Sequence, residues 1–542
     1  MTDDDFLADV RAKHKRAQDA ASDNNDNWID DVRFAKLLEQ WPEEIKRQRE
    51  LDGRPCLVKP RLQAYIRQVV NEARQNRPAI NVVPADSNAD VETAEIMSGL
   101  IRNIEVSSDA DIAYDTAADC AVSGGFGYFR INTAYTSDDT FDQDIVIERI
   151  ADPLTVLPDP DAESADGSDW NCAFICKTIL KDDFEAQYNG AEPVDWDDMG
   201  YAKLDNPWYD DEHVMVVEYW HREDVESQIV AMSDGSVRKA DDPSIELLAQ
   251  FGVTPVGEPR TVKSKKVTQY ILSGAEVLET VEWPGKYIPI VPVYGDEVVC
   301  EGKRTFKSLI RDAKDAQRDL NYWESMATET IALAPKVPFI GPEGAFDSDV
   351  EKWSTANDSS HAFITYKGQI PPQRQGYAGP SAGELQRAMG AVDDMKAIMG
   401  IYDASLGQRS NETSGVAIRQ RQRQGDVATY HFLDNLSRSI RHAGRILIDL
   451  IPKVYSTARV VRVLGEDMEP QNAQIGPQEG PAHEGQEVRR IYDLGAGKYD
   501  LVVKAGPAFG TQREAAREEL VEVIRACGDK TVQTARNGGC VT

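Results

Sequence analysis

The sequence predicts a helix-rich α+β protein with more than one domain, and three observations lead to this fold class. The chain has 542 residues, which is too long for one hydrophobic core, so two to four domains are expected. Apolar residues have helical spacing before residue 122 and strand-like alternation from about 126 to 297. Helical spacing returns after residue 303.

The N-terminal part predicts helices. Residues 3–52 have the composition of two polar helices separated by SDNNDN at 22–27. The next helix ends before Pro78, and its apolar positions are Leu62, Tyr65, Ile66, Val69 and Val70. Residues 90–122 predict two further helices.

The middle part predicts a β-rich region. GGFGYFRINTAYTS and DIVIERI alternate like strands on either side of a polar turn, SDDTFDQ, which indicates a β-hairpin. The further predicted strands are AFICKTIL, VMVVEYWH, SQIVAM, KVTQYILSG and EVLETVEW. KYIPIVPVYGD closes this region near residue 297.

Long helices follow. Residues 303–334 contain neither glycine nor proline, and they predict one helix of about 45–50 Å. Pro335 to Pro380 bound a compact insertion with a short polar helix near 347–356. The remaining predicted helices are 381–399 and a very long stretch that ends near Ile451.

The C-terminal part predicts a mixed ending. Residues 465–487 are rich in Pro, Gly, Glu and Gln, which is typical of a solvated loop. KYDLVVKAG then predicts a strand, and residues 511–527 predict a final helix before a disordered tail.

Composition excludes several classes of protein. The net charge of −32 argues against general binding of nucleic acid. No run of about 18 apolar residues predicts a membrane span, and the N-terminus lacks the apolar core of a signal peptide, so a soluble protein made in a cytoplasm is expected. The seven cysteines are scattered, and only Cys172 and Cys176 are close, which favours buried free thiols over a zinc site.

Two motifs have both a functional and a structural interpretation. Gly124, Gly125 and Gly127 precede a strand rather than opening a helix, so a structural turn is favoured over a phosphate loop. PDPDAESADGSD resembles a calcium loop but has Ser164 where an EF-hand needs glycine, which favours turns and caps. The acidic residues of this loop are Asp159, Asp161, Glu163, Asp166 and Asp169. No arrangement of nucleophile, base or paired carboxylates predicts a catalytic site.

One dense basic segment, SGVAIRQRQRQGD at 414–426, stands out in this acidic chain. At 100° per residue, a buried stripe forms from Leu433, Leu436, Ile440, Ala443, Leu447 and Leu450. An adjacent stripe contains Arg419, Arg423, Arg438, Arg441 and Arg445. Arg421 falls on the far side, and Gly425 and Gly444 are positions where a kink would break this register. A solvated helix face is the simplest interpretation, whereas a ring of copies would form a basic band.

The order of these elements resembles that of the portal proteins of short-tailed, podovirus-type bacteriophages that package DNA by a headful mechanism. The resemblance covers roughly residues 30–527. Five segments carry it: RPAINVVPADSNADVETAEIMSGLIRNIE, SGGFGYFRINTAYTSDDTFDQDIVIERIADPLTVLPDPDAESADGSDW, VPVYGDEVVCEGKRTFKSLIRDAKDAQRDLNYWES, SGVAIRQRQRQGDVATYHFLDNLSRSIR and YDLVVKAGPAFGTQREAAREEL.

The resemblance implies a homododecameric ring at one capsid vertex, which conducts double-stranded DNA during packaging and ejection. The terminase large subunit docks on such a ring first, and a tail adaptor or head-completion protein replaces it. The major capsid and scaffolding proteins are further implied partners. The resemblance implies no enzyme activity, cofactor, metal or membrane, and it implies a virion protein assembled in the host cytoplasm.

The resemblance also assigns parts of the portal fold. The expected parts are a mixed α/β wing at 1–297, a stem helix at 298–334, a small α/β clip at 335–380, a second stem helix at 381–399, a tunnel loop at 400–414, a long kinked helix returning to the wing at 415–510, and the start of a crown with the C-terminal tail at 511–542. Because the chain ends at Thr542, the expected crown is minimal or truncated.

Site residues follow from these assignments. The five arginines of the stripe are expected to line the DNA channel and to keep the duplex centred in an otherwise acidic lumen, since phosphate contacts are independent of sequence. Expected tunnel-loop residues are Tyr402, Gln408, Arg409 and Asn411. Candidate clip contacts to terminase or adaptor are Lys336, Lys352, Lys367 and Arg374, chosen by location.

Two alternatives remain open at the level of sequence. One is another ring or connector protein of the virion, although adaptors are usually much smaller. The other is a metal-dependent DNA-processing enzyme that uses the loop from Asp159 to Asp169.

Overall fold

The computed structural model describes most of the chain up to residue 504. The described residues are 3–86, 89–192, 196, 213–233, 237–240, 245, 249, 252–333, 338–356, 359–374, 382–401, 415–457, 459–465, 467, 469–476, 491–492, 494 and 497–504. The fold mixes helices and small sheets, with 42% of the described residues helical and 29% in strands, which confirms the predicted class. No helix of the described part is long and apolar enough to cross a membrane.

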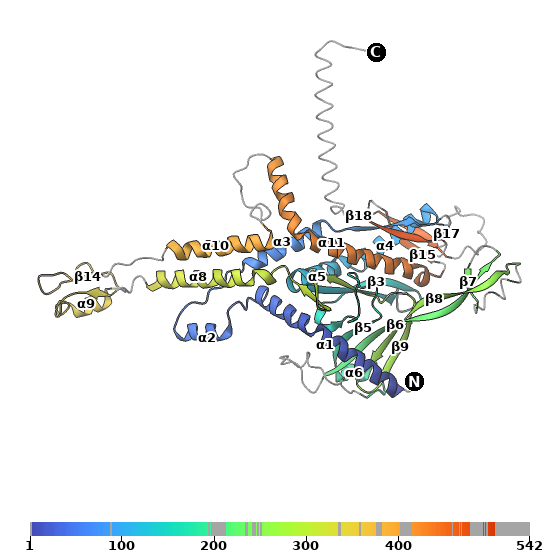
Figure 1. Cartoon of the computed structure of the whole chain (residues 1–542), viewed down its shortest axis with the longest axis horizontal. Coiled ribbons are helices and arrows are strands. Elements are labelled where there is room, and N and C mark those ends of the chain that lie inside the picture. The colour runs from blue at the N-terminus through green and yellow to red at the C-terminus, as the bar shows by residue number, and fades with distance from the viewer. Residues whose placement is uncertain are drawn as a thin grey trace, which may run out of the picture. The chain divides into compact units, whose positions relative to one another are not determined.

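The chain divides into two compact units (Figure 1). The larger unit contains Met1–Asn27, Val70–Lys307 and His431–Thr542, and the smaller contains Trp28–Val69 and Ser308–Tyr430. Three helices have residues in both units: α1 (Asp3–Ala35), α3 (Arg61–Gln75) and α11 (Gly415–Val454).

The predicted hairpin forms the centre of the larger unit. Strands β2 (Phe126–Tyr135) and β3 (Gln143–Arg149) pair antiparallel, and β10 (Ile290–Tyr294) pairs with the other edge of β2. Helices α4 (Val91–Ser107) and α5 (Ala110–Gly124) precede this sheet, as expected for residues 90–122. The predicted glycine turn is confirmed as structural, because α5 ends at Gly124 and Gly125 adopts φ 108° before β2 begins.

A six-stranded antiparallel sheet forms the second layer of the larger unit. Its strands are β4 (Val156–Leu157), β5 (Cys172–Leu180), β6 (His213–Met232), β7 (Val237–Lys239), β8 (Pro255–Leu272) and β9 (Val277–Trp283). A short helix, α6 (Lys181–Gln187), follows β5.

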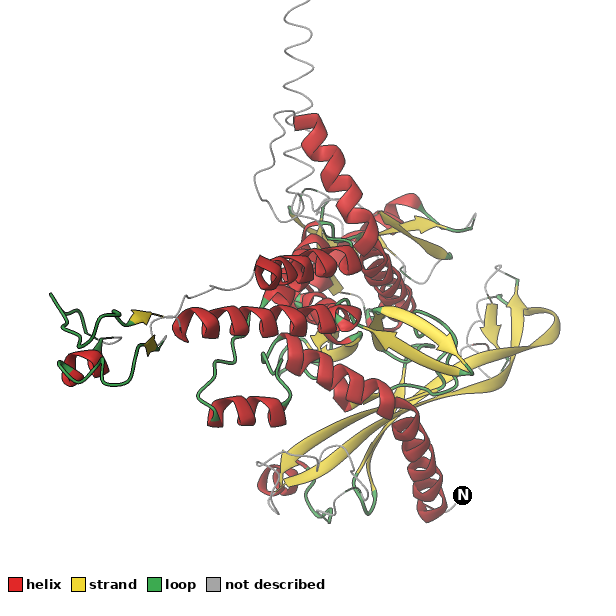
Figure 2. Ribbon diagram, turned by 60° about the vertical axis from the view of Figure 1, so that its left-hand side comes forward, coloured by secondary structure: helices red, strands yellow, loops and turns green. Residues whose placement is uncertain are grey.

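The two strands predicted in VMVVEYWH and SQIVAM are one strand, β6, paired along most of its length with β8 (Figure 2). The intervening REDVE stays extended because its acidic residues face lysines of β8. Asp224 and Lys265 are 2.5 Å apart, and Glu226 and Lys263 are 3.9 Å apart.

Three small sheets complete the described part of the larger unit, one of them a strand pair at 296–307. Another pairs β1 (Ala79–Pro84) with β18 (Tyr499–Lys504), the predicted strand near the C-terminus. The third contains β15 (Arg459–Leu464), β16 (Pro470–Ile475) and β17 (Ile491–Tyr492). The prediction of a loop at 465–487 is therefore wrong at β16, where Pro470 is tolerated as the first residue of the strand. The predicted helix at 511–527 lies outside the described residues.

The smaller unit is built on helices. Its elements are α2 (Glu43–Leu51), α8 (Lys314–Leu333), α9 (Val350–Thr355), α10 (Ala382–Met399) and a two-stranded ladder of β13 (Phe339–Ile340) with β14 (Gln373–Arg374). Helices α8 and α10 lie side by side (Figure 1). The helices predicted at 347–356 and 381–399 are thus confirmed.

The single helix predicted for 303–334 is wrong in its first third. Lys303–Lys307 form strand β12, which pairs with β11 (Asp296–Cys300), and a 3₁₀ turn at Arg311–Ala313 precedes α8. Helix α8 has 20 residues and is therefore about 30 Å long. Residues 303–307 form a strand rather than a helix because Phe306 stacks on Tyr294, with ring centroids 4.1 Å apart.

The predicted break at 22–27 is also wrong, because α1 continues through SDNNDN. Asn25 is buried, and the Asn24 amide bonds the backbone of β12. Asn side chains destabilise helices when they compete for local backbone groups, and these distant partners remove that competition.

Asp31, a fully buried carboxylate of α1, organises the smaller unit. Its Oδ2 accepts hydrogen bonds from Ser308 Oγ at 2.7 Å and from Arg311 Nη2 at 2.7 Å. Lys314 Nζ lies 2.5 Å from Oδ1. Farther along α8, Gln317 donates to the Lys59 carbonyl and Asn321 donates to Gln40. A buried polar face thus binds α8 to the N-terminal segments of this unit.

Replacing Asp31 with alanine would leave the buried Lys314 and the half-buried Arg311 without their shared partner. We expect the free energy of unfolding to fall by about 3–5 kcal/mol, measured by guanidinium denaturation of the subunit. Asp30→Ala is the matched control, because Asp30 contacts the same Lys314 from an exposed position. The control should cost less than about 1 kcal/mol, and equal losses in both variants would contradict this role of Asp31.

Candidate functional site

The predicted arginine stripe lies on α11. Along the second half of this helix, Leu436, Ile440, Ala443, Leu447 and Leu450 are buried and Leu433 is half-buried, as the predicted register requires. Arg438, Arg441 and Arg445 are exposed on the adjacent face. Gly444 does not interrupt the helix: a Cβ there would lie 3.0 Å from Leu501 Cδ1, so the missing side chain makes room for β18.

The three exposed arginines differ in their partners. Arg438 contacts Asp434 one turn earlier at 2.5 Å, and Arg445 contacts Asp166 at 3.1 Å. No side chain in the described part of the chain pairs with Arg441.

The structure does not describe the side chains of several predicted site residues. Arg419, Arg421 and Arg423 belong to α11, but their side chains lie outside the described part. The tunnel-loop candidates Tyr402, Gln408, Arg409 and Asn411 also lie outside the described residues, as does Lys336. Their assignments stay predictions.

The other clip candidates surround a small aromatic cluster. Trp353 of α9 packs edge-on against Phe339 and Phe346, and its Nε1 donates to the Thr365 carbonyl at 2.9 Å. Lys352 lies over the Phe363 ring at 4.5 Å, and Arg374 lies over Phe339 at 5.4 Å. Arg374 and Lys367 are exposed, whereas Lys352 is half-buried. This segment thus presents cations beside a cluster of partly exposed aromatic rings.

The carboxylates of the acidic loop bind its own backbone. Asp159 accepts the amides of Asp161 at 3.0 Å and Asn171 at 2.8 Å. Asp169 accepts the amides of Glu163 and Ser164 at 2.6 and 2.8 Å. Among the described residues, no group of three His, Cys, Asp or Glu side chains is placed to hold a metal ion. The loop is therefore shaped by side-chain caps.

Asp166 of this loop faces a buried histidine of α11. Burial opposes ionisation of Asp166, but hydrogen bonds from Ser168 and the charges of His442 and Arg445 hold its pKa below the usual value. His442 is fully buried against Tyr287, at 5.4 Å between ring centroids, and burial lowers its pKa to about 4. Neither ring nitrogen of His442 has a hydrogen-bond partner among the described residues.

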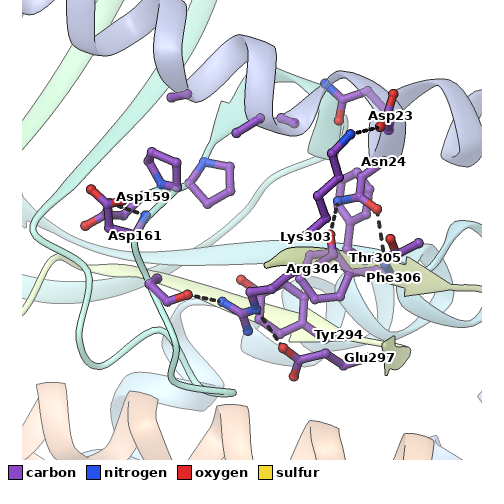
Figure 3. A pocket seen from close by; sticks show the side chains of 18 of the residues that line it. Asp23, Asn24, Asp159, Asp161, Tyr294, Glu297, Lys303, Arg304, Thr305 and Phe306 are labelled. Carbon is purple, nitrogen blue, oxygen red and sulfur yellow. Dashed lines mark hydrogen bonds and ion pairs between the residues drawn. The ribbon is translucent and has the colours of Figure 1, made fainter. Parts of the chain in front are cut away.

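A pocket of about 740 Å³ opens between α1, residues 158–163 and the β11–β12 hairpin (Figure 3). Its aromatic lining residues are Phe126, Tyr128, Tyr294 and Phe306. Arg304 closes one side: it contacts Glu297 at 2.6 Å, donates to the Ala162 carbonyl at 2.8 Å and lies over Tyr294. This pocket was not predictable from the sequence, because segments 22–27 and 303–307, whose predicted structures are both wrong, contribute to its walls.

Two comparisons with known proteins both match this chain to phage portal proteins. The model of the phage P22-like portal protein family matches residues 11–536. The portal protein of Acyrthosiphon pisum secondary endosymbiont phage 1 is 27% identical over 491 residues, which cover 86% of this chain and 67% of that protein.

The buried His442 predicts a dependence of stability on pH. Its pKa of about 4 in the folded chain is below the ordinary value of 6.5. Between these pH values the unfolded chain binds a proton that the folded chain does not, so stability falls as the pH falls from 6.5 to 4. This group contributes up to about 3 kcal/mol to that loss.

We expect His442→Leu to flatten the decline in the free energy of unfolding between pH 6.5 and 4. His361→Gln is a suitable control, because His361 is a partly exposed histidine in a different unit. Denaturation curves at several pH values measure the slope, and an unchanged slope in His442→Leu would show that His442 is not the group involved.

Proposed function

Because this chain belongs to the phage P22-like portal protein family, we propose that twelve copies form a ring that conducts double-stranded DNA into and out of a capsid. Portal proteins are structural components of the virion rather than enzymes. The family match over nearly the whole chain carries this proposal. It favours a portal over the smaller connector proteins, and the capped acidic loop offers no support for a metal-dependent enzyme.

We assign α8 and α10 to the stem of the ring. Both helices have large apolar side chains on exposed surface, including Ile331 at 56% and Met389 at 72%. Tyr322 of α8 and Ile398 of α10 are also exposed. Exposed apolar faces of paired helices are typical of surfaces covered by neighbouring subunits. This supports packing of the helix pair against the same pair in the next copy.

The arginines of α11 are assigned to the channel. A conduit must guide the duplex without holding it, so a few contacts to phosphate serve better than a basic wall. Ion pairs partly neutralise Arg438 and Arg445, whereas Arg441 has no such partner among the described residues. With Arg419 and Arg423, Arg441 is the strongest candidate for phosphate contact.

The segment around α9 is assigned to the clip. Its exposed Lys367, Arg374 and Phe363 offer charge and apolar surface to a docking protein. We propose that the terminase large subunit binds here during packaging and that a tail adaptor follows. The major capsid and scaffolding proteins would contact the ring at the vertex, with assembly in the host cytoplasm.

The ring itself is the first test. We expect purified protein to give twelve-fold rings with a central hole in negative-stain images. Native mass spectrometry should report twelve subunits of 60.2 kDa. A protein that stays monomeric and cleaves DNA when metal is added would contradict the portal assignment.

The channel arginines give a second test. Arg441→Gln, and separately Arg419→Gln with Arg423→Gln, should change packaging or ejection of the genome several-fold and weaken its dependence on salt, since fewer phosphates are neutralised. Arg47→Gln on α2 removes an exposed cation outside the stripe and serves as the control. Wild-type packaging and ejection in all variants would rule out the proposed role.

A further inference from the structure

The β11–β12 hairpin has one protected edge and one open edge. Its turn is formed by Glu301 and Gly302, both with positive φ, so Cys300 and Lys303 flank a two-residue turn as a hydrogen-bonded pair. Backbone groups alternate along each strand. The main chain of Arg304 and Phe306 therefore points away from β11, and that of Glu297 and Val299 points away from β12.

Helix α1 protects the β12 edge. The Asn24 amide donates from Nδ2 to the Arg304 carbonyl at 2.9 Å, and its Oδ1 accepts from the Phe306 amide at 3.1 Å (Figure 3). One side chain thus supplies both a donor and an acceptor, as a neighbouring strand would.

The β11 edge has no such partner in the described part of the chain. No described residue bonds the outward amide or carbonyl groups of Glu297 and Val299. All five residues of β11 are exposed, with Val298 at 43% and Val299 at 63%. The last of the five is Cys300.

Strand β8 of the same unit shows how an exposed edge is usually protected against the addition of another strand. N-terminal to Val267, β8 no longer pairs with β9, and this edge, which no strand of the described part pairs, carries Lys263, Lys265 and two prolines, Pro255 and Pro259. Lysine and proline on an edge discourage the addition of another strand. Strand β11 has neither lysine nor proline, and its two central residues beside the acidic Asp296 and Glu297 are valines.

The pocket lies beside this open edge and indicates what the partner carries. Glu297 and Val299 line the pocket, so a strand added to β11 would direct alternate side chains toward it. The lining includes Lys303 and Arg304 as its two cations. Its carboxylates are Asp19, Asp23, Asp159, Asp161, Glu163 and Glu297. This excess of acid over an aromatic floor suits a segment with apolar and basic side chains.

We propose that an extended segment of a second copy of this chain adds to β11 as a third strand and fills the pocket. Portal proteins assemble with themselves, and each copy in a ring offers one side to the next. Strand addition joins partners through main-chain bonds. The inference rests on the ring assembly proposed above.

Wild-type protein provides the first measurement, with N-ethylmaleimide as the probe. Rings and dissociated subunits are alkylated in parallel, and the peptide containing Cys300 is followed by mass spectrometry. We expect Cys300 to react at least about tenfold more slowly in the ring, because an added strand covers this edge. Hydrogen exchange over residues 296–300 should slow on assembly as well. Equal rates for rings and subunits would overturn the proposal while leaving the ring intact.

Two variants separate strand addition from simple crowding. Val299→Pro removes an outward N–H that the hairpin does not use, and it should shift the equilibrium from rings to subunits. Val299→Thr keeps that N–H and the branched shape, so it should assemble like wild type. Ring formation by Val299→Pro with Cys300 still protected would overturn the strand pairing.

Two further outcomes would also contradict the proposal. Protection of Cys300 that appears only after other virion proteins are added would overturn the assignment to a second copy. If wild-type protein forms no ring, the proposed function fails and this inference fails with it.

Discussion

The larger unit depends on the close approach of β2 to α5 at Gly127. A Cβ at this position would lie 2.3 Å from the Ala117 carbonyl oxygen and 2.8 Å from Cys120 Cβ, which excludes every other residue. The same approach recurs nearby: the Gly295 amide bonds the Gly125 carbonyl at 2.7 Å, and a Cβ on Gly295 would lie 2.5 Å from the Lys307 carbonyl oxygen. These contacts fix where β10 gives way to the β11–β12 hairpin, and hence the position of the aromatic floor of the pocket.

The elements that local patterns determine were predictable from the sequence. The β2–β3 hairpin, α3, α10 and the register of α11 all have periodic apolar residues, and burial follows that period. The failures at 22–27 and 303–307 have one shared cause. Asn24 and Arg304 are 280 residues apart in sequence, and each segment takes its structure from the other. Phe306 fits a helical or a strand period equally well, so only the tertiary stack on Tyr294 decides between them.

The candidate site likewise combines features that local sequence predicts with contacts that only the tertiary structure reveals. The exposed face of Arg438, Arg441 and Arg445 follows from helical geometry, and the Asp434 partner of Arg438 lies one turn away in sequence. The Asp166 partner of Arg445 is 279 residues away in sequence, so helical spacing could not predict this contact. It gives Arg445 an acidic partner, whereas Arg441 has none in the described part of the chain. Acidic residues therefore determine which of the described arginines on this face carry an ion pair.

The Asn24 amide has a consequence for chemical ageing. Its two ends have different tasks, since the nitrogen donates to the Arg304 carbonyl and the oxygen accepts from the Phe306 amide. Deamidation would exchange that nitrogen for a second oxygen and place two acceptors face to face. The cost of an unpaired buried acceptor is about 1–3 kcal/mol, with an added negative charge beside Asp23. Deamidation of Asn24 in α1 would therefore weaken the attachment of strand β12, which lies 280 residues away in sequence.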